Sequence, residues 1–211
     1  MRRLSSPIPA IALVLSLCGA SVRAEPVTYT IVSKISRVAF SLEHQGFIQL
    51  FGTLRLAPGS FTFDADDWSK SAIAVTMPIK SLDMGDATWN NQIRGDSEWA
   101  KLFRTRAITF HSTRLEHGEG NSGLLYGELE LAGVKRPVVL QLKFNKIGKN
   151  EVDDFPSVGF SATTTLKRSE FGLDAYSDLV GDAITVQIQV EAAQGKDGDA
   201  KHPTTALGVK R

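Results

Sequence analysis

Histidine and acidic residues are the side chains of this chain that could hold a metal ion. His111 and His117 are separated by five residues across one strand end, but no Cys or paired carboxylate joins them in a recognised zinc spacing. The run DADD, residues 64–67, begins like a calcium loop but lacks the glycine and the terminal glutamate at the EF-hand spacing. We therefore predict no metal site and interpret DADD as a solvated acidic turn.

Two serine motifs could supply a nucleophile, and neither has the right context. GFSA, residues 159–162, lacks the second glycine of a nucleophile elbow and falls in a strand pattern instead of a strand-to-helix turn. GDSE, residues 95–98, contains a Gly-Asp-Ser that esterases and many ordinary loops share. The sequence has neither a phosphate-binding glycine loop nor a dinucleotide fingerprint. We predict a protein that is not an enzyme and needs no cofactor; the alternative is a secreted hydrolase or isomerase acting on a lipid.

Alternation of apolar and polar residues with period two is the dominant pattern of the chain. It predicts about eight or nine strands, each with one dry face, separated by turn sequences. Strands this close in sequence pair antiparallel through short connections. The alternating runs fall near residues 27–31, 38–42, 47–56, 73–79, 108–110, 125–131, 138–144, 158–162 and 184–190.

Strands with one dry face must bury it, in a two-sheet sandwich or in a barrel. Runs of about eight to ten residues give strands of roughly 25–33 Å, which favours a deep barrel. An eight-stranded barrel has an interior just wide enough for side chains or for one small ligand. The inward aromatic residues could therefore fill a core or line a cavity, and the pattern alone does not choose between the two.

Residues 80–106 break the alternation. Asp86 as N-cap and Gly95 as terminator predict a short helix within this stretch. Its apolar residues need an apolar surface to cover, which predicts either a lid over the barrel or a crossover packed on the core. These residues are Trp89, Ile93, Trp99, Leu102 and Phe103.

The N-terminal residues have the pattern of a secretory signal peptide. A basic MRR start precedes an apolar run at 10–20, and Val22 and Ala24 fit the positions before a signal-peptidase cut. The run is too short for a permanent anchor, and no later segment is long and apolar enough to span a membrane. The sequence thus predicts export to the periplasm after removal of residues 1–24.

The mature chain should form one domain over residues 25–193, followed by a flexible polar tail at 194–211. The only cysteine, Cys18, leaves with the signal, so the domain is held by its core without disulfides. A formal charge of +1 and the lack of a dense Lys/Arg block give no indication of nucleic-acid binding.

Five segments together resemble the YceI family of exported bacterial proteins. The likeness runs over about residues 29–193, and the order and spacing of the segments make it specific. The segments are SRVAFSLEHQGFIQLFGTL, ITFHSTRLE, LAGVKRPVVLQLKF, GFSATTTLKRSEFGL and VGDAITVQIQVEA.

The resemblance implies an all-β fold, an antiparallel eight-stranded (lipocalin-like) β-barrel with a short helical or loop insertion. It also implies that a long-chain isoprenoid, quinone-like or fatty ligand binds inside the barrel without being transformed. The chain departs from the family at WNNQIR, residues 89–94, where Asn90 and Gln92 stand in place of the usual Asp and His. The usual Tyr-Pro before ITF is also absent.

With the resemblance, we predict which residues line the lipid cavity and which meet a head group at its rim. His44 ends an inward-facing row, so it should lie at the rim, binding the head group or capping the strand. Trp89, Arg94 and Arg168 complete the rim, since a guanidinium offers a planar fork of donors; surface salt bridging is the alternative for both arginines, with Glu170 near Arg168. The lining residues are Tyr29, Val38, Phe40, Leu42, Phe110, Leu142, Phe144, Phe160, Val186 and Ile188.

Two points stay open at the level of sequence. The barrel could work alone or as a homodimer. It could also be a scaffold with a filled core that presents residues 80–106 to a protein partner.

Overall fold

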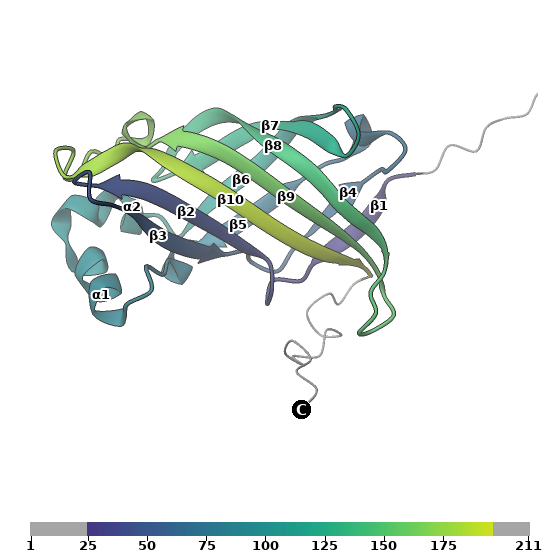
Figure 1. The fold of residues 1–211 in the computed structure, drawn as a ribbon, viewed down its shortest axis with the longest axis horizontal. Helices are drawn as coiled ribbons and strands as arrows, with labels where there is room; N and C mark the ends of the chain where they lie inside the picture. Colours follow the sequence, from purple (N-terminus) through teal and green to yellow (C-terminus); the bar gives the residue numbers. More distant parts are fainter. Residues whose placement is uncertain (1–24, 196–211) are drawn as a thin grey trace, which may run out of the picture.

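The computed structural model describes residues 25–195 (Figure 1). The predicted signal peptide and residues 196–211 of the predicted tail lie outside this range. The strands are β1 (Val27–Ile31), β2 (Arg37–His44), β3 (Ile48–Arg55), β4 (Ser60–Phe63), β5 (Ala74–Pro78), β6 (Ala107–His117), β7 (Ser122–Leu131), β8 (Val134–Lys149), β9 (Pro156–Lys167) and β10 (Val180–Gln194). The helices are α1 (Ala87–Gly95) and α2 (Ala100–Arg104), with 3-10 turns η1 (Trp68–Lys70), η2 (Ile79–Ser81), η3 (Ser97–Trp99) and η4 (Arg168–Phe171).

The strands form one antiparallel sheet with eight positions in the order β3-β2-β10-β9-β8-β7-β6-β5. β1 continues the position of β2 along β10, and β4 pairs with β1 as β3 pairs with β2. At the break between β1 and β2, the Ser36 hydroxyl donates to the Glu191 carbonyl (3.2 Å) and accepts from the Glu191 amide (3.1 Å). A buried side chain thus replaces the missing ladder bonds. The predicted eight-stranded antiparallel fold is confirmed.

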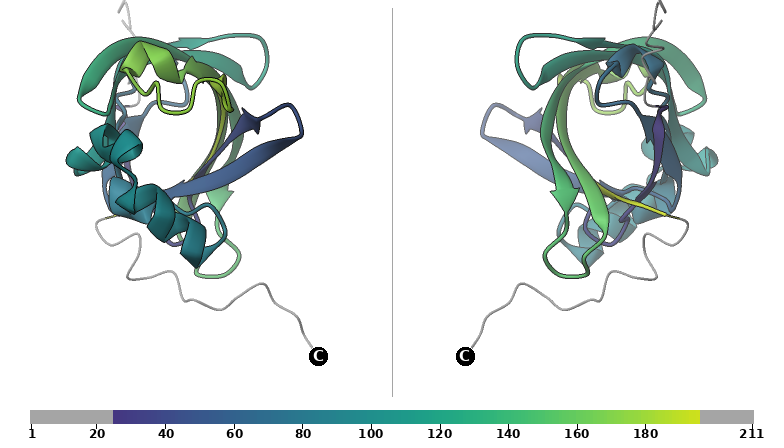
Figure 2. Two further views of the ribbon diagram at one scale, coloured as in Figure 1. Left: turned by 90° about the vertical axis from the view of Figure 1, so that its left-hand side faces the viewer. Right: turned by 90° about the vertical axis from the view of Figure 1, so that its right-hand side faces the viewer.

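The sheet curls around a central space, and its two edges approach each other along part of their length (Figure 2). Few hydrogen bonds join this seam: Thr53 and Asp83 exchange a pair of backbone bonds (2.8 and 3.0 Å), and the Ala57 amide donates to the Thr76 carbonyl (2.8 Å). Thr62 and Ala72 form a similar pair. These contacts cover part of each edge strand and so shorten the open edge that could pair with another chain.

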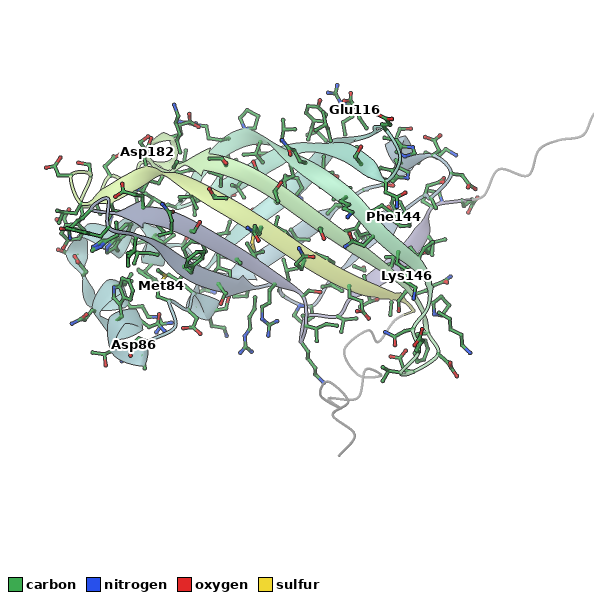
Figure 3. The ribbon with its side chains drawn as sticks, in the orientation of Figure 1. Met84, Asp86, Glu116, Phe144, Lys146 and Asp182 are labelled. Atoms are coloured by element: carbon green, nitrogen blue, oxygen red, sulfur yellow. The ribbon has the colours of Figure 1, made fainter. Side chains whose placement is uncertain are left out.

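An aromatic cluster, here called the plug, fills the end of the barrel away from the helices; Phe144 marks it in Figure 3, with Met84 and Asp86 at the opposite end. The Phe63 ring lies 5.0 Å from Phe160 and 5.6 Å from Trp68, centroid to centroid. Phe63 belongs to β4, which the alternation analysis missed because the strand has only four residues. The plug consists of Tyr29, Phe61, Phe63, Trp68, Phe144 and Phe160.

The residues considered for metal binding have other roles near this end. The His117 ring stacks on Trp68 at 4.1 Å, and no group of three metal-ligating side chains occurs within residues 25–195. Asp64 is not the solvated residue that we predicted, because it is only 3% exposed. Its carboxylate accepts the amides of Asp66 (3.0 Å) and Asp67 (2.9 Å), so it organises the turn from within.

Two phenylalanines lie flat against the barrel wall because glycines leave room for them. The Phe40 ring of β2 covers Gly52 of β3, and the Phe110 ring of β6 covers Gly127 of β7. A Cβ atom at either glycine would collide with the ring. The glycines therefore keep both rings out of the centre of the barrel.

We predict that Gly127→Ala lowers the free energy of unfolding by about 1–3 kcal/mol, because its Cβ displaces the Phe110 ring and crowds the β6 backbone. Urea unfolding followed by tryptophan fluorescence measures the change. Gly95→Ala is the control, since a Cβ there meets no atom within 4 Å. A Gly127→Ala protein as stable as the parent would contradict this account of the wall.

Candidate ligand-binding cavity

The barrel interior between the plug and the helical end encloses a cavity of about 610 Å³. This volume falls within the range of about 300–1,000 Å³ typical of small-molecule sites. The wall is apolar along most of its length and is built by inward side chains of the strands. The filled core that the scaffold alternative requires is therefore not found in the described residues, and a protein partner for residues 80–106 stays a prediction.

The structure brings eight of the ten predicted lining residues to the cavity wall. Tyr29 and Phe144 do not line it: Tyr29 stacks on Phe61 (6.1 Å between centroids) and Phe144 on Phe63 (5.7 Å), both in the plug. Alternation gives the face of a strand and not the depth along the barrel, which explains the difference. The eight are Val38, Phe40, Leu42, Phe110, Leu142, Phe160, Val186 and Ile188.

Most of the polar side chains that line the cavity gather at the helical end, which we call the mouth. His44 lies there, as the last residue of β2. Gln92, Asp96, Arg168 and Tyr176 come from α1, the loop after it, η4 and the β9–β10 connection. The cavity is therefore apolar in its depth and polar at one end.

Residues 80–106 form part of the wall at the mouth. The helix α1 begins as predicted, with the Asp86 carboxylate accepting the Trp89 amide (2.8 Å). Trp89, Ile93, Trp99 and Leu102 line the cavity, which supports the lid interpretation, and Leu102 and Phe103 also pack on the core. The segment thus combines both predicted roles.

Asn90 fixes the approach to α1. Its side-chain oxygen accepts the Met84 amide (2.8 Å), and its side-chain nitrogen donates to the Asp83 carboxylate (2.8 Å). The latter bond, followed by the Gly85 amide, lowers the pKa of Asp83. Asn90 stands out in the sequence as a departure from the family pattern, but no sequence signal predicts this role.

Arg94 does not contribute to the predicted head-group site. Its side chain is exposed, lies outside the cavity lining, and donates to the Leu82 carbonyl (2.8 Å). The contact ties the C-terminal turn of α1 to the chain entering the segment.

Arg168 lies at the mouth, but neither the surface position nor the Glu170 salt bridge considered for it is found. The residue is 3% exposed, and its guanidinium donates to four backbone carbonyls. These are the carbonyls of Leu173, Ala175 (2.7 Å), Val180 (2.7 Å) and Gly181 (3.0 Å). Four of its five N–H donors are therefore engaged in holding the β9–β10 connection.

A second contact closes the mouth from the side of the helices. The Tyr176 hydroxyl donates to the Asp96 carboxylate (2.6 Å), and the Tyr176 and Trp99 rings are 6.4 Å apart. This hydrogen bond, followed by the Glu98 amide, lowers the pKa of Asp96, and the same bond raises the pKa of Tyr176. Both residues lie in loops 80 positions apart, so no periodic pattern could have paired them.

Comparisons with known proteins agree with this architecture. A UPF0312 protein of Ectopseudomonas mendocina (strain ymp) is 31% identical over 186 residues, covering 88% of this chain and 95% of that protein. The crystal structure of BcnA from Burkholderia cenocepacia superposes with a TM-score of 0.66 at 20% identity, over 77% of this chain and 99% of that one. A structure described as a polyisoprenoid binding domain from Saccharophagus degradans superposes with a TM-score of 0.58 at 13% identity, over 80% and 99%.

An antiparallel barrel with one apolar chamber and a polar mouth defines the lipocalin-like class of β-barrel proteins. Within that class the chain belongs to the YceI-like family, whose domain matches residues 29–192. No helix within residues 25–195 is long and apolar enough to cross a bilayer.

We predict that Arg168→Lys lowers the free energy of unfolding by on the order of 3 kcal/mol, since an ammonium cannot reach four carbonyls in this fork geometry. Amide exchange over residues 173–181 should accelerate in parallel. Arg136→Lys, at an exposed position, should change stability by less than about 0.5 kcal/mol. Equal stability of the two variants would contradict the role of the Arg168 hydrogen bonds in holding the β9–β10 connection.

The Asp96–Tyr176 hydrogen bond predicts a pH-dependent contact. Since the folded pKa of Asp96 is lowered, its contribution to stability is present above the ordinary carboxyl range and is lost as pH falls through the folded pKa. Tyr176→Phe should raise the pKa of Asp96 toward its ordinary value, as measured by NMR titration of the carboxyl carbon. Tyr126→Phe, which removes a bond to Glu116 instead, should leave the Asp96 titration unchanged; an Asp96 curve insensitive to Tyr176→Phe would rule out the contact.

Proposed function

We propose that this protein binds one molecule of a long-chain isoprenoid or similar lipid inside the barrel and carries it through the periplasm without transforming it. The observation that carries the proposal is the polarity of the cavity: apolar from the plug outward, with its polar groups concentrated at the mouth. An elongated amphiphile has the same division, with its chain inside and its head group at the opening.

The energetics favour an apolar chain over water in this space. The cavity would hold about 20 water molecules at bulk density, and its wall offers them few hydrogen-bond partners. Each CH₂ group moved out of water contributes roughly 0.8 kcal/mol. A chain long enough to fill the cavity therefore gains far more than a compact polar ligand would.

The groups at the mouth favour an uncharged head group. Arg94 lies outside the cavity and four of the five N–H donors of Arg168 are engaged, so a phosphate would find few free hydrogen-bond donors there. The Asp96 carboxylate is occupied by Tyr176. His44 and Gln92 remain as partners for a carbonyl or hydroxyl, such as the ring oxygens of a quinone-like lipid.

Family membership and one structural neighbour support the ligand class. The Saccharophagus degradans structure is described as a polyisoprenoid binding domain and shares the fold. The predicted export signal and the family likeness support the periplasmic setting. The structure gives no support to the hydrolase alternative, because the candidate nucleophile Ser97 is exposed in η3 and lies outside the cavity lining.

We predict that Ala162→Phe abolishes lipid binding while the protein stays folded, because the added ring enters the free space of the cavity. Thr163→Phe is the matched control: it adds the same ring at the next residue, whose side chain is exposed on the outer face of β9. Native mass spectrometry of protein purified from the periplasm should show one bound lipid in the parent and in Thr163→Phe.

Two results would overturn the proposal. The first is a parent protein that is repeatedly isolated without lipid and takes up none on titration with an isoprenoid quinone. The second is equal lipid content in Ala162→Phe and Thr163→Phe.

A further inference from the structure

Large apolar side chains are exposed next to the mouth of the barrel. Phe47 in the β2–β3 turn is 82% exposed, and Ile48, the first residue of β3, is 57% exposed. In the β9–β10 connection, Leu179 is 44% exposed and Tyr176 43%. We call these four residues the mouth patch. The Gln45 amide donates to the Leu179 carbonyl (2.8 Å), so the two loops are fixed to each other. A grouping of this kind at one end of a protein marks an interaction site more often than a random surface feature.

The backbone presents Phe47 at a tip and not on a flat face. Gln45 and Gly46 both adopt left-handed conformations (φ 52° and 72°), and the Phe47 amide donates to the His44 carbonyl (3.0 Å). This tight turn reverses the chain at the end of the barrel, and the hairpin stands away from the barrel wall (Figure 2). A standard protein interface uses about 20–30 residues a side, whereas two loop tips offer four apolar side chains. The shape fits insertion into a soft layer better than it fits a second copy of the chain.

The charge of the two loops restricts the kind of lipid layer. Residues 43–48 and 172–180 contain Glu43, Asp174 and Asp178 and no Lys or Arg. An anionic lipid surface attracts basic segments and repels acidic ones. The mouth patch therefore suits a zwitterionic surface, which it would bind through apolar contact with little help from charge.

The mouth patch is also continuous with the cavity. His44 lines the cavity and precedes the turn that carries Phe47 and Ile48, and Tyr176 and Leu179 belong to the patch and to the cavity lining. A lipid leaving a bilayer under the patch would therefore pass from the apolar side chains of the patch, past the polar groups of the mouth, to the apolar wall of the cavity.

We propose that the mouth patch docks the barrel end-on onto a zwitterionic lipid bilayer, inserting Phe47 and Ile48, so that the ligand passes directly between bilayer and cavity. This inference rests on the proposed carrier function. It goes beyond that function by assigning the membrane-facing surface and the lipid class of the membrane.

The test measures vesicle binding and lipid binding separately. Lipid-free full-length mature protein is sedimented with phosphatidylcholine vesicles, and uptake of an isoprenoid quinone is measured without vesicles. Phe47→Ser with Ile48→Ser, two residues of the mouth patch outside the cavity lining, should weaken vesicle binding about tenfold or more and slow quinone transfer between vesicles. It should leave quinone affinity in solution unchanged. Val152→Ser is the matched control, since Val152 is 67% exposed in the β8–β9 turn at the opposite end.

Each outcome supports or overturns the docking surface. Loss of vesicle binding in the double variant but not in Val152→Ser supports it. If the parent protein takes up quinone but does not bind vesicles, the docking proposal is wrong and the carrier function is unaffected. Failure to take up quinone tells against the carrier function, and the vesicle result still decides the docking. Stronger binding when a third of the lipid is anionic, or a dimer that the double variant abolishes, overturns the proposal in favour of charge-driven docking or of a second copy.

Discussion

The cavity depends on aromatic rings that lie against the barrel wall instead of meeting at its centre. Phe40 covers Gly52 and Phe110 covers Gly127, so each ring fills the space that a side chain on the neighbouring strand would have taken. The same device closes the other end, where Trp68 covers Gly123 and joins the plug. Aromatic residues thus seal one end of the barrel and line the other without filling it. Phe40, Phe110 and Trp68 each lie where a glycine of a neighbouring strand leaves room for the ring.

The mouth is held by one buried cation that pairs with backbone carbonyls. Its four hydrogen bonds compensate for the loss of water around the Arg168 guanidinium. Asp182 lies close by: the amide and hydroxyl of Ser169 lower the pKa of its carboxyl, and the charge of Arg168 lowers it further. Because these contacts fix the β9–β10 connection, the exposed side chains of Tyr176 and Leu179 stay in place beside the cavity.

The sequence predicts local features of this fold well and long-range contacts poorly. Alternation identified nine of the strands and the inward face of most of them, and the Asp86 cap identified α1, because both signals depend on neighbouring residues. The depth of Tyr29 and Phe144 depends on how far each strand is shifted in the barrel, and alternation does not contain that shift. The roles of Arg94 and Arg168 depend on which carbonyls the folded loops present. The four-residue strand β4 was too short to give a periodic signal.

The departure at WNNQIR has two separate physical explanations. At position 90, the side chain must accept the Met84 amide and donate to the Asp83 carboxylate, and an amide can do both. An ionised Asp there could only accept and would face a second carboxylate, so Asn90 is the residue that suits Asp83.

At position 92, Gln92 lines the cavity mouth as a neutral group where the family pattern has a titratable His. The first change preserves the fold of the lid, whereas the second changes the surface that a head group would contact. The mouth, whose guanidinium and carboxylate are both largely engaged in hydrogen bonds within the protein, is thus a property of this chain's own residues.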